Sequence, residues 1–307
     1  MERIRAIAKQ LYERLLRHEL SEMPSHVAVI QDGNRRYAAE RGQDRTDGHR
    51  MGAETAKELL QWCDELGIQE ATLYTFSTEN FRRPEAEREA LFDLISEKLR
   101  QFADADRVHE SEVRLRAIGE THRLPPRVQE AIEYAEGRTC EYDNLHLNVA
   151  LAYGGRAELL DATRHIARDV AAGDLDPSEI DVDLVESMLD SDPVRDVDLL
   201  IRTGGEVRTS NFLPWQANGN EAAVYFCTPY WPEFRKIDFL RGIRTYAHRE
   251  RAWQQTRTTR ARALLQAIGS ADRPDVQQAL GRLQDDLPER RSGTGLLATD
   301  DGEELGD

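Results

Sequence analysis

Short apolar segments rich in β-branched residues alternate with helical segments along most of this chain. Apolar runs that end near glycine or asparagine are typical of strands, whereas apolar residues three and four positions apart are typical of amphipathic helices. The expected strands cover residues 26–31, 71–76, 113–118, 145–150, 197–201 and 223–226, and the expected helices include 52–66, 87–102 and 158–171. This alternation predicts an α/β fold, a single domain with a central six-stranded, mostly parallel sheet flanked by helices.

The two ends of the chain depart from this alternation. Apolar residues recur at helical spacing from Ile4 to Leu15, so residues 1–25 are expected to form an N-terminal amphipathic helix that packs on the main domain. The main domain is expected to span residues 26–254. Residues 255–307 are expected to form a helical extension followed by a disordered, flexible tail, because the end of the chain is acidic and rich in glycine.

The charge of the chain limits its partners. Asp and Glu outnumber Lys and Arg by 57 to 41, which gives a formal net charge of −16 and disfavours nucleic acid as a partner. The lysines are few: Lys9, Lys57, Lys98 and Lys236. An acidic surface with little lysine is typical of proteins from a halophilic archaeon, although a high-GC coding bias would also replace lysine by arginine.

Nothing in the sequence indicates export or insertion into a membrane. No apolar run is long enough to span a bilayer, and the N-terminus lacks the apolar core of a secretory signal. Cys63, Cys140 and Cys227 are too few and too far apart to indicate a disulfide framework or a zinc site. A cytoplasmic protein is therefore expected.

A cluster of polar residues follows the first expected strand. It comprises Asp32, Gly33, Asn34, Arg35 and Arg36, with Arg45 and His49 downstream. Ligands of parallel sheets bind beyond the carboxyl ends of the strands, and arginines beside a glycine turn suit a phosphate group. Because a carboxylate repels phosphate unless a cation such as Mg²⁺ bridges them, Asp32 indicates a metal. Taken alone, the segment also fits an Asx turn that caps a helix and carries surface arginines.

A second loop of this kind follows the fifth expected strand. Gly204 and Gly205 form a tight turn, and Arg202, Arg208 and Ser210 can converge there on a second anion. An ordinary glycine loop with salt-bridged arginines would show the same pattern. Two anion sites in one chain favour a reaction between two phosphorylated substrates.

Six segments along residues 26–251 carry a resemblance to a known family. They read HVAVIQDGNRRYAAERG, GHRMGA, LYTFSTENFRRP, LNVALAYGGR, DLLIRTGGEVRTSNFLPWQ and YWPEF. Their order and spacing resemble those of cis-prenyltransferases of the undecaprenyl diphosphate synthase type, and the Arg35-Arg36-Tyr37 variant is similar to archaeal members. The resemblance implies the six-stranded family fold, a homodimer, and a catalytic domain at residues 26–254.

The resemblance also implies the reaction. Such enzymes condense isopentenyl diphosphate onto an allylic diphosphate (geranylgeranyl or farnesyl diphosphate) with Mg²⁺ as the cofactor. The product is a long-chain polyprenyl diphosphate for a glycosyl carrier lipid, so peripheral contact with a membrane is expected. A trans-type synthase would need aspartate-rich DDxxD motifs, which the sequence lacks.

The functional residues implied by the resemblance follow from the matching positions. Asp32 and Asn80 are expected to be catalytic, and Asp32 and Glu221 to hold Mg²⁺. The implied substrate-binding residues are Gly33, Asn34, Arg35, Arg36, Tyr37, Arg45, His49, Ser77, Phe81, Arg83, Arg202, Arg208 and Ser210. The growing chain is expected to enter an apolar tunnel, for which the candidate lining residues are Leu73, Thr75, Leu91, Phe92 and Ile95, although each also fits an ordinary core.

One position departs from the family pattern. Members commonly carry Arg-x-Gly near the end of the domain, and its arginine reaches the partner subunit, whereas here Arg251 is followed by Ala252 and Trp253. The alternative to an active enzyme is therefore a non-catalytic or weakly active scaffold subunit of a heteromeric cis-prenyltransferase. Non-catalytic relatives tend to lose the aspartate and the arginines of the first cluster, which this chain keeps.

Overall fold

The computed structural model describes residues 13, 16, 20, 22–189, 196–218 and 222–269, and for 257–269 it describes the backbone alone. The chain divides into two units, residues 1–250 and residues 251–307. The sheet lies entirely in the first unit. In the second unit the described part belongs to a helix.

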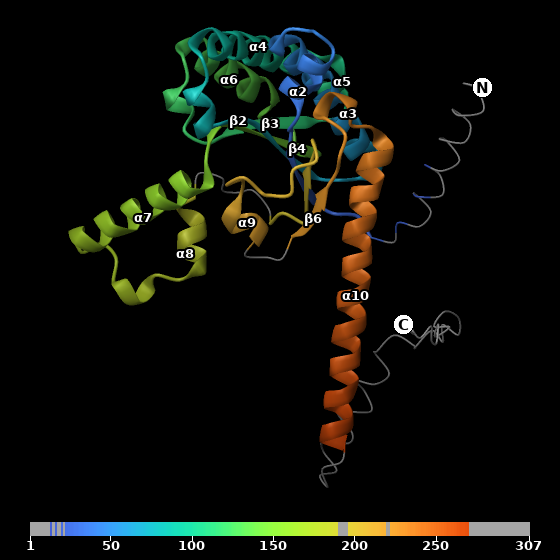
Figure 1. The fold of residues 1–307 in the computed structure, drawn as a ribbon. Coiled ribbons are helices and arrows are strands. Elements are labelled where there is room, and N and C mark those ends of the chain that lie inside the picture. Colours follow the sequence, from blue (N-terminus) through green and yellow to red (C-terminus); the bar gives the residue numbers. More distant parts are fainter. Residues whose placement is uncertain are drawn as a thin grey trace, which may run out of the picture. The chain divides into compact units, whose positions relative to one another are not determined.

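Six parallel strands form one sheet (Figure 1). They are β1 (His26–Ile30), β2 (Glu70–Ser77), β3 (Val113–Ile118), β4 (Leu145–Tyr153), β5 (Leu199–Arg202) and β6 (Ala223–Phe226). Their order is β3-β4-β2-β1-β5-β6, and every neighbouring pair is parallel, which confirms the expected sheet. After β4 the chain crosses to the other side of β1, so β1 and β5 flank a topological switch point, where open parallel sheets bind ligands.

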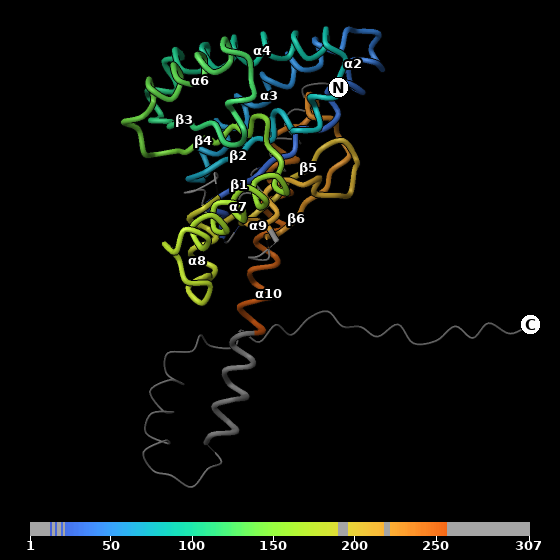
Figure 2. The backbone as a smooth tube through the Cα atoms, turned by 90° about the vertical axis from the view of Figure 1, so that its left-hand side faces the viewer, coloured from blue at the N-terminus to red at the C-terminus, as the bar shows by residue number. Residues whose placement is uncertain are grey.

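The helices flank the sheet. They are α2 (Asn34–Glu40), α3 (Arg45–Leu66), α4 (Glu85–Ala103), α5 (Asp106–Glu110), α6 (Pro126–Thr139), α7 (Gly155–Ala172), α8 (Val182–Ser187), α9 (Pro214–Asn218) and α10 (Lys236–Gly269). Short 3₁₀ turns occur at Thr78–Arg82, Thr121–Arg123, Pro177–Glu179 and Trp231–Glu233. Figures 1 and 2 show α3, α4 and α6 over one face of the sheet, and α7 and α9 toward the other.

The helix expected at residues 52–66 begins earlier, at Arg45. Gly52 interrupts the apolar pattern, but it does not break the helix. A Cβ atom at Gly52 would lie 2.3 Å from Asn34 Oδ1 and 2.7 Å from Trp231 Cδ1. Glycine is therefore required here because α2 and the turn at Trp231 approach the helix closely.

Side chains of the central strand β1 point alternately into two apolar clusters, one on each face of the sheet. Val27 and Val29 belong to the larger apolar cluster, together with Leu73 of β2 and Ile95 of α4. Ala28 and Ile30 belong to a smaller cluster on the opposite face of the sheet. All five residues of β1 are buried, as expected for a strand covered on both faces.

The predictions for the chain ends are only partly within the described residues. In the predicted N-terminal helix, Glu13 and Leu16 are helical, and Leu16 is buried. Helix α10 continues past residue 254 to Gly269, and the division of the chain at residue 254 stays a prediction. The acidic tail lies outside the described residues. Within the described part of the chain, none of the helices has the length and apolar character needed to cross a membrane.

Candidate active site

The carboxyl ends of β1 and β5 bring the two predicted clusters together. In the register of the sheet, Ile30 pairs with Arg202, so the segments that follow both strands leave the sheet side by side. Arg202 Nη2 lies 2.7 Å from Asp32 Oδ2, and Arg36 Nη2 lies 3.1 Å from Asp32 Oδ1. Thr203 fixes the backbone of Asp32, because its hydroxyl accepts from the Asp32 N–H at 3.0 Å and donates to the Asp32 carbonyl at 2.7 Å.

The turn after Asp32 depends on Gly33. Its φ of +104° lies in the region that favours glycine, and a Cβ atom would lie 2.6 Å from Tyr230 Cδ1. The backbone N–H of Trp231 donates to the Asp32 carbonyl at 3.0 Å, which holds the Tyr230–Trp231 turn against the loop. This packing keeps the backbone at residues 32–34 in one conformation.

The loop after β5 surrounds a buried arginine. The Arg202 side chain is only 4% exposed, and its Nη1 donates to the Arg208 carbonyl at 2.7 Å and to the Ser210 hydroxyl. Ser210 and Asn211 have φ values of +51° and +62°, which are strained for residues other than glycine. The Arg208 side chain is 64% exposed and pairs with Glu206. The loop therefore offers one fixed cation and one exposed cation.

Glu87 of α4 forms ion pairs with three of the predicted arginines. Its carboxylate lies 2.8 Å from Arg45 Nη1, 3.2 Å from Arg83 Nη1 and 3.4 Å from Arg35 Nε. Burial by itself would raise the pKa of this carboxyl, but the hydrogen bond from Arg45 and the charges of Arg35 and Arg83 outweigh it and lower the pKa. Glu87 was not among the predicted site residues, because only Arg83 lies near it in the sequence, whereas Arg35 and Arg45 belong to distant segments.

His49 is held neutral in the same region. Burial, and then the charge of Arg83, lowers the pKa of its imidazole to about 4. Arg83 Nη1 lies 3.4 Å from His49 Nε2, and because a guanidinium can only donate, Nε2 is the acceptor. At neutral pH the uncharged ring therefore accepts from Arg83 through Nε2 and carries its proton on Nδ1, which can donate to a ligand.

These side chains surround an open cavity of about 410 Å³. Its lining consists of Gln31, Asp32, Gly33, Asn34, Arg35, Arg36, Ala39, Arg45, His49 and Arg83. Four of these lining residues are arginines, and they outnumber the two carboxylates that pair with them, Asp32 and Glu87, so the cavity suits an anion such as a diphosphate. We call it the arginine cavity.

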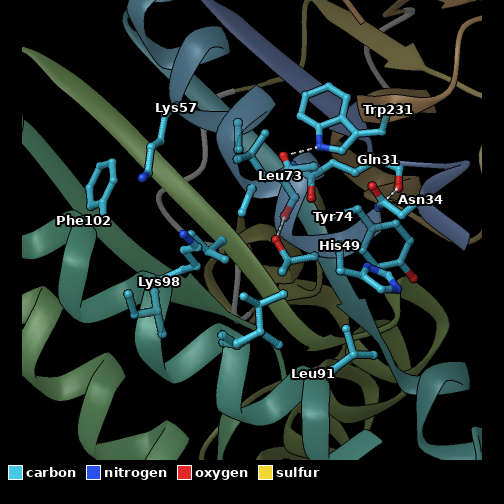
Figure 3. Close-up of a pocket in the computed structure, with 18 of the residues that line it drawn as sticks. Gln31, Asn34, His49, Lys57, Leu73, Tyr74, Leu91, Lys98, Phe102 and Trp231 are labelled. Carbon is cyan, nitrogen blue, oxygen red and sulfur yellow. Dashed lines mark hydrogen bonds between the residues drawn. The ribbon is translucent and has the colours of Figure 1, made fainter. Parts of the chain in front are cut away.

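A second cavity, of about 210 Å³, extends between the sheet and helices α3 and α4. Its lining is mostly apolar and includes Leu60, Leu73, Leu91, Leu94, Ile95, Leu99, Phe102, Leu115, Leu147 and Val149. Figure 3 shows Gln31, Asn34 and His49 on one side of it and Lys57, Lys98 and Phe102 on the other. We call it the apolar cavity. Four residues line both cavities: Gln31, Asn34, His49 and Arg83.

Comparison with known proteins agrees with this geometry. Residues 30–254 match the prenyltransferase family model described as a putative undecaprenyl diphosphate synthase. The chain belongs to the cis-prenyltransferase family. It is 62% identical, over 90% of this chain and 91% of the relative, to the tritrans,polycis-undecaprenyl-diphosphate synthase (geranylgeranyl-diphosphate specific) of Haloarcula marismortui. The protein of the same name in Halobacterium salinarum is 61% identical over 92% of this chain and 93% of the relative.

A solved structure of the family has the same fold. The lavandulyl diphosphate synthase from Lavandula x intermedia, in complex with dimethylallyl diphosphate, superposes with a TM-score of 0.68 and 33% sequence identity. The match covers 73% of this chain and 95% of that one. The six-stranded parallel sheet is therefore the sheet of the cis-prenyltransferase fold.

The structure places most of the expected site residues of this cis-prenyltransferase around the two cavities. Asn80 lines the apolar cavity, and its Oδ1 accepts a 3.1 Å hydrogen bond from the Ser77 N–H. Phe81 instead packs on Phe76, with ring centroids 5.1 Å apart. Tyr37 lines neither cavity, and the Arg41 guanidinium lies over its ring.

Four of the five candidate tunnel residues line the apolar cavity: Leu73, Thr75, Leu91 and Ile95. Phe92 does not. Its ring packs against Phe76 with centroids 5.2 Å apart, because residue 92 points toward the neighbouring part of the core. Phe92 is therefore part of the ordinary core.

The described residues fit a magnesium ion that is held jointly by protein and substrate. Among them there is no group of three or more His, Cys, Asp or Glu side chains that could hold a metal alone. Mg²⁺ commonly binds to one or two carboxylates together with substrate phosphates, and Asp32 supplies one partly exposed carboxylate at the arginine cavity. Glu221, the other predicted ligand, lies outside the described residues.

Proposed function

We propose that this cis-prenyltransferase condenses isopentenyl diphosphate onto an allylic diphosphate to give a long-chain polyprenyl diphosphate. The supporting observation is the direct meeting of the arginine cavity and the apolar cavity at four shared residues. A prenyl diphosphate has the same two parts, a diphosphate and an apolar chain. The product of such an enzyme would serve as the precursor of a glycosyl carrier lipid.

The allylic diphosphate is proposed to bind in the arginine cavity, with its chain in the apolar cavity. Gly33, Asn34, Arg35, Arg36, Arg45 and His49 then surround the diphosphate. Isopentenyl diphosphate is proposed to bind at Arg202, Arg208 and Ser210, of which Arg202 pairs with Asp32 and contacts the Ser210 hydroxyl. The relatives' names specify geranylgeranyl diphosphate, which favours that primer over farnesyl diphosphate.

The residues of the arginine cavity account for the chemistry. Arginines fixed before substrate arrives stabilise the charge that develops on the leaving diphosphate when the allylic C–O bond breaks. The double bond of isopentenyl diphosphate then attacks carbon 1, and loss of a proton sets the new cis double bond. Asp32 would hold Mg²⁺ against the diphosphate, and the ion would supply further positive charge to the leaving group. Fixing two charged substrates side by side removes much of the entropic barrier.

The proposal also covers the source organism, the oligomeric state, the cellular location and the domain bounds of the enzyme. The acidic, lysine-poor composition and the haloarchaeal relatives support a halophilic archaeon as the source. A homodimer, a cytoplasmic location with peripheral membrane contact, and a catalytic domain at residues 26–254 are proposed from the family. The scaffold alternative has no support from the site, because Asp32, Arg35 and Arg36 are all present at the cavity.

Incubation of the purified protein with labelled isopentenyl diphosphate tests the proposal. Each primer, geranylgeranyl or farnesyl diphosphate, is supplied with and without Mg²⁺, in high and in low salt. We expect long polyprenyl products that require Mg²⁺ and form best from geranylgeranyl diphosphate. Absence of any elongated product in all conditions would refute the enzyme and favour the scaffold.

A further inference from the structure

Gln31 lies at the junction of the two cavities. It is one of the four residues that line both the arginine cavity and the apolar cavity. If the diphosphate binds in one cavity and the carbon chain in the other, the C1–O bond lies at their junction. This step rests on the proposed function.

The direction of β1 places the Gln31 side chain on the side of the apolar cavity. Val27 and Val29 point to the core beneath α3 and α4, whereas Ala28 and Ile30 point to the other face of the sheet. Side chains of a strand alternate, so the residue two positions beyond Val29 points to the same face. Figure 3 shows Gln31 beside Asn34 at the edge of the apolar cavity.

Each of the other three residues at the junction has at least one side-chain partner, although the Asn34 Oδ1 acceptor is buried without one. Asn34 Nδ2 donates to the Gln31 carbonyl at 3.2 Å, and Arg83 contacts both His49 and Glu87. Within the described part of the chain, the side-chain amide of Gln31 makes no hydrogen bond, although it is partly buried. A partly buried amide without a partner, next to an anion cavity, is available to a ligand.

We propose that the Gln31 side chain donates a hydrogen bond to the bridging oxygen of the allylic diphosphate as the C1–O bond breaks. The bond electrons move to that oxygen, which gains negative charge, while carbon 1 becomes an allylic cation. The π electrons of isopentenyl diphosphate then form the new C–C bond, and the proton lost from its carbon 2 leaves with the released diphosphate. Gln31 changes no bond of its own and is a catalytic residue by contact with the reacting atoms.

A neutral amide suits this position better than the alternatives. A carboxylate would repel the diphosphate, and an apolar side chain would leave the bridging oxygen without a donor as its charge grows. A further arginine would strengthen binding of substrate and transition state alike, with less gain in rate. The amide N–H acts chiefly where charge develops.

Single-turnover kinetics of Gln31→Met test this role, because methionine is similar in size and lacks the donor. With the enzyme in excess over geranylgeranyl diphosphate, we expect the rate of the first condensation to fall about 10- to 100-fold. This is the range for the loss of a hydrogen bond to a charged group. Affinity for an unreactive S-thiolo analogue of the primer, measured by calorimetry, should change less than about twofold, because sulfur is a weak acceptor. Gln31→Glu should be slower still at neutral pH.

Gln43→Met is the matched control, because Gln43 is exposed and lines neither cavity. It should keep the wild-type rate. If Gln31→Met does not fold, as judged by circular dichroism and analogue binding, Gln31→Leu replaces it. A rate close to wild type in the folded variant, or a loss confined to substrate affinity, would overturn the role of Gln31. An inactive wild-type protein would instead overturn the proposed function itself.

Discussion

The Arg202 guanidinium and the Asp32 carboxylate form an ion pair with an N–O distance of 2.7 Å, although 170 residues separate them in the sequence. Arg202 is almost fully buried, so its charge is poorly solvated and holds Asp32 in place. The two proposed diphosphate sites therefore meet at this pair. A metal at Asp32 and a substrate at Arg202 would influence one another directly.

Asp32→Asn keeps the shape of the side chain but removes its charge. We expect turnover to fall by at least about 100-fold, because the variant loses the proposed metal carboxylate and leaves Arg202 without a counter-ion. Incorporation of labelled isopentenyl diphosphate measures the effect, and circular dichroism checks the fold. Asp143→Asn, at an exposed carboxylate that lines neither cavity, serves as the control. Activity near wild type in Asp32→Asn would remove Asp32 from the mechanism.

Glu87→Gln should destabilise the protein in a pH-dependent way. The Arg45 hydrogen bond and the charges of Arg35 and Arg83 lower the folded-state pKa of Glu87 from 4.5 despite its burial. Its contribution to stability is therefore fully present above about pH 4.5 and is lost as the pH falls through the folded-state pKa. Urea unfolding of wild type and variant should show a gap at pH 7 that shrinks toward pH 3. A constant gap would contradict the ionic role.

His49 should stay neutral well below the pH at which an ordinary histidine gains a proton. Its folded-state pKa is lowered from 6.5 to about 4, so the unfolded state binds more protons between these values. The free energy of unfolding should therefore decrease as the pH falls from 6.5 to 4. NMR titration of the imidazole, assigned with His49→Gln, gives the pKa directly. A midpoint near 6.5 would show that the site is solvated.

Two helical glycines offer opposite outcomes for the same substitution. Gly52→Ala in α3 should be destabilising by about 1–3 kcal/mol, because the new methyl group would contact Asn34 and Trp231. Gly137→Ala in α6 should be stabilising by about 0.5–1 kcal/mol, since no atom lies within 4 Å of the added Cβ. Thermal unfolding distinguishes them. Equal effects of the two variants would argue against the close approach at Gly52.

Much of the fold could be predicted from local patterns. The six strands were expected close to their observed positions, because buried parallel strands are read from short β-branched runs with turn residues after them. The arginine cavity was also foreseen in outline. Residues just after parallel strands share one edge of the sheet, so Asp32 and Arg202 had to be neighbours if β1 and β5 were adjacent.

The remaining features of the site depend on contacts between distant segments. Glu87 meets Arg45 across 42 residues, and nothing near either residue in the sequence indicates the pair. Phe92 and Ile95 belong to the same helix, yet only Ile95 reaches the apolar cavity, since helix α4 turns Phe92 toward Phe76. The role inferred for Gln31 likewise needed the position of two cavities relative to one strand.

The sequence by itself determined the strands, the helices and the residue types at the sheet edge, because these follow from periodicity and from the chemistry of each side chain. The tertiary structure alone decided which arginines share Glu87, which apolar residues enclose a cavity, and that four residues, Gln31 among them, line both cavities. Such contacts are set by how helices pack on the sheet, which depends on many side chains at once. The proposed chemistry thus rests on residues 26–49, and the packing of α3 and α4 around them gives the proposed site its geometry.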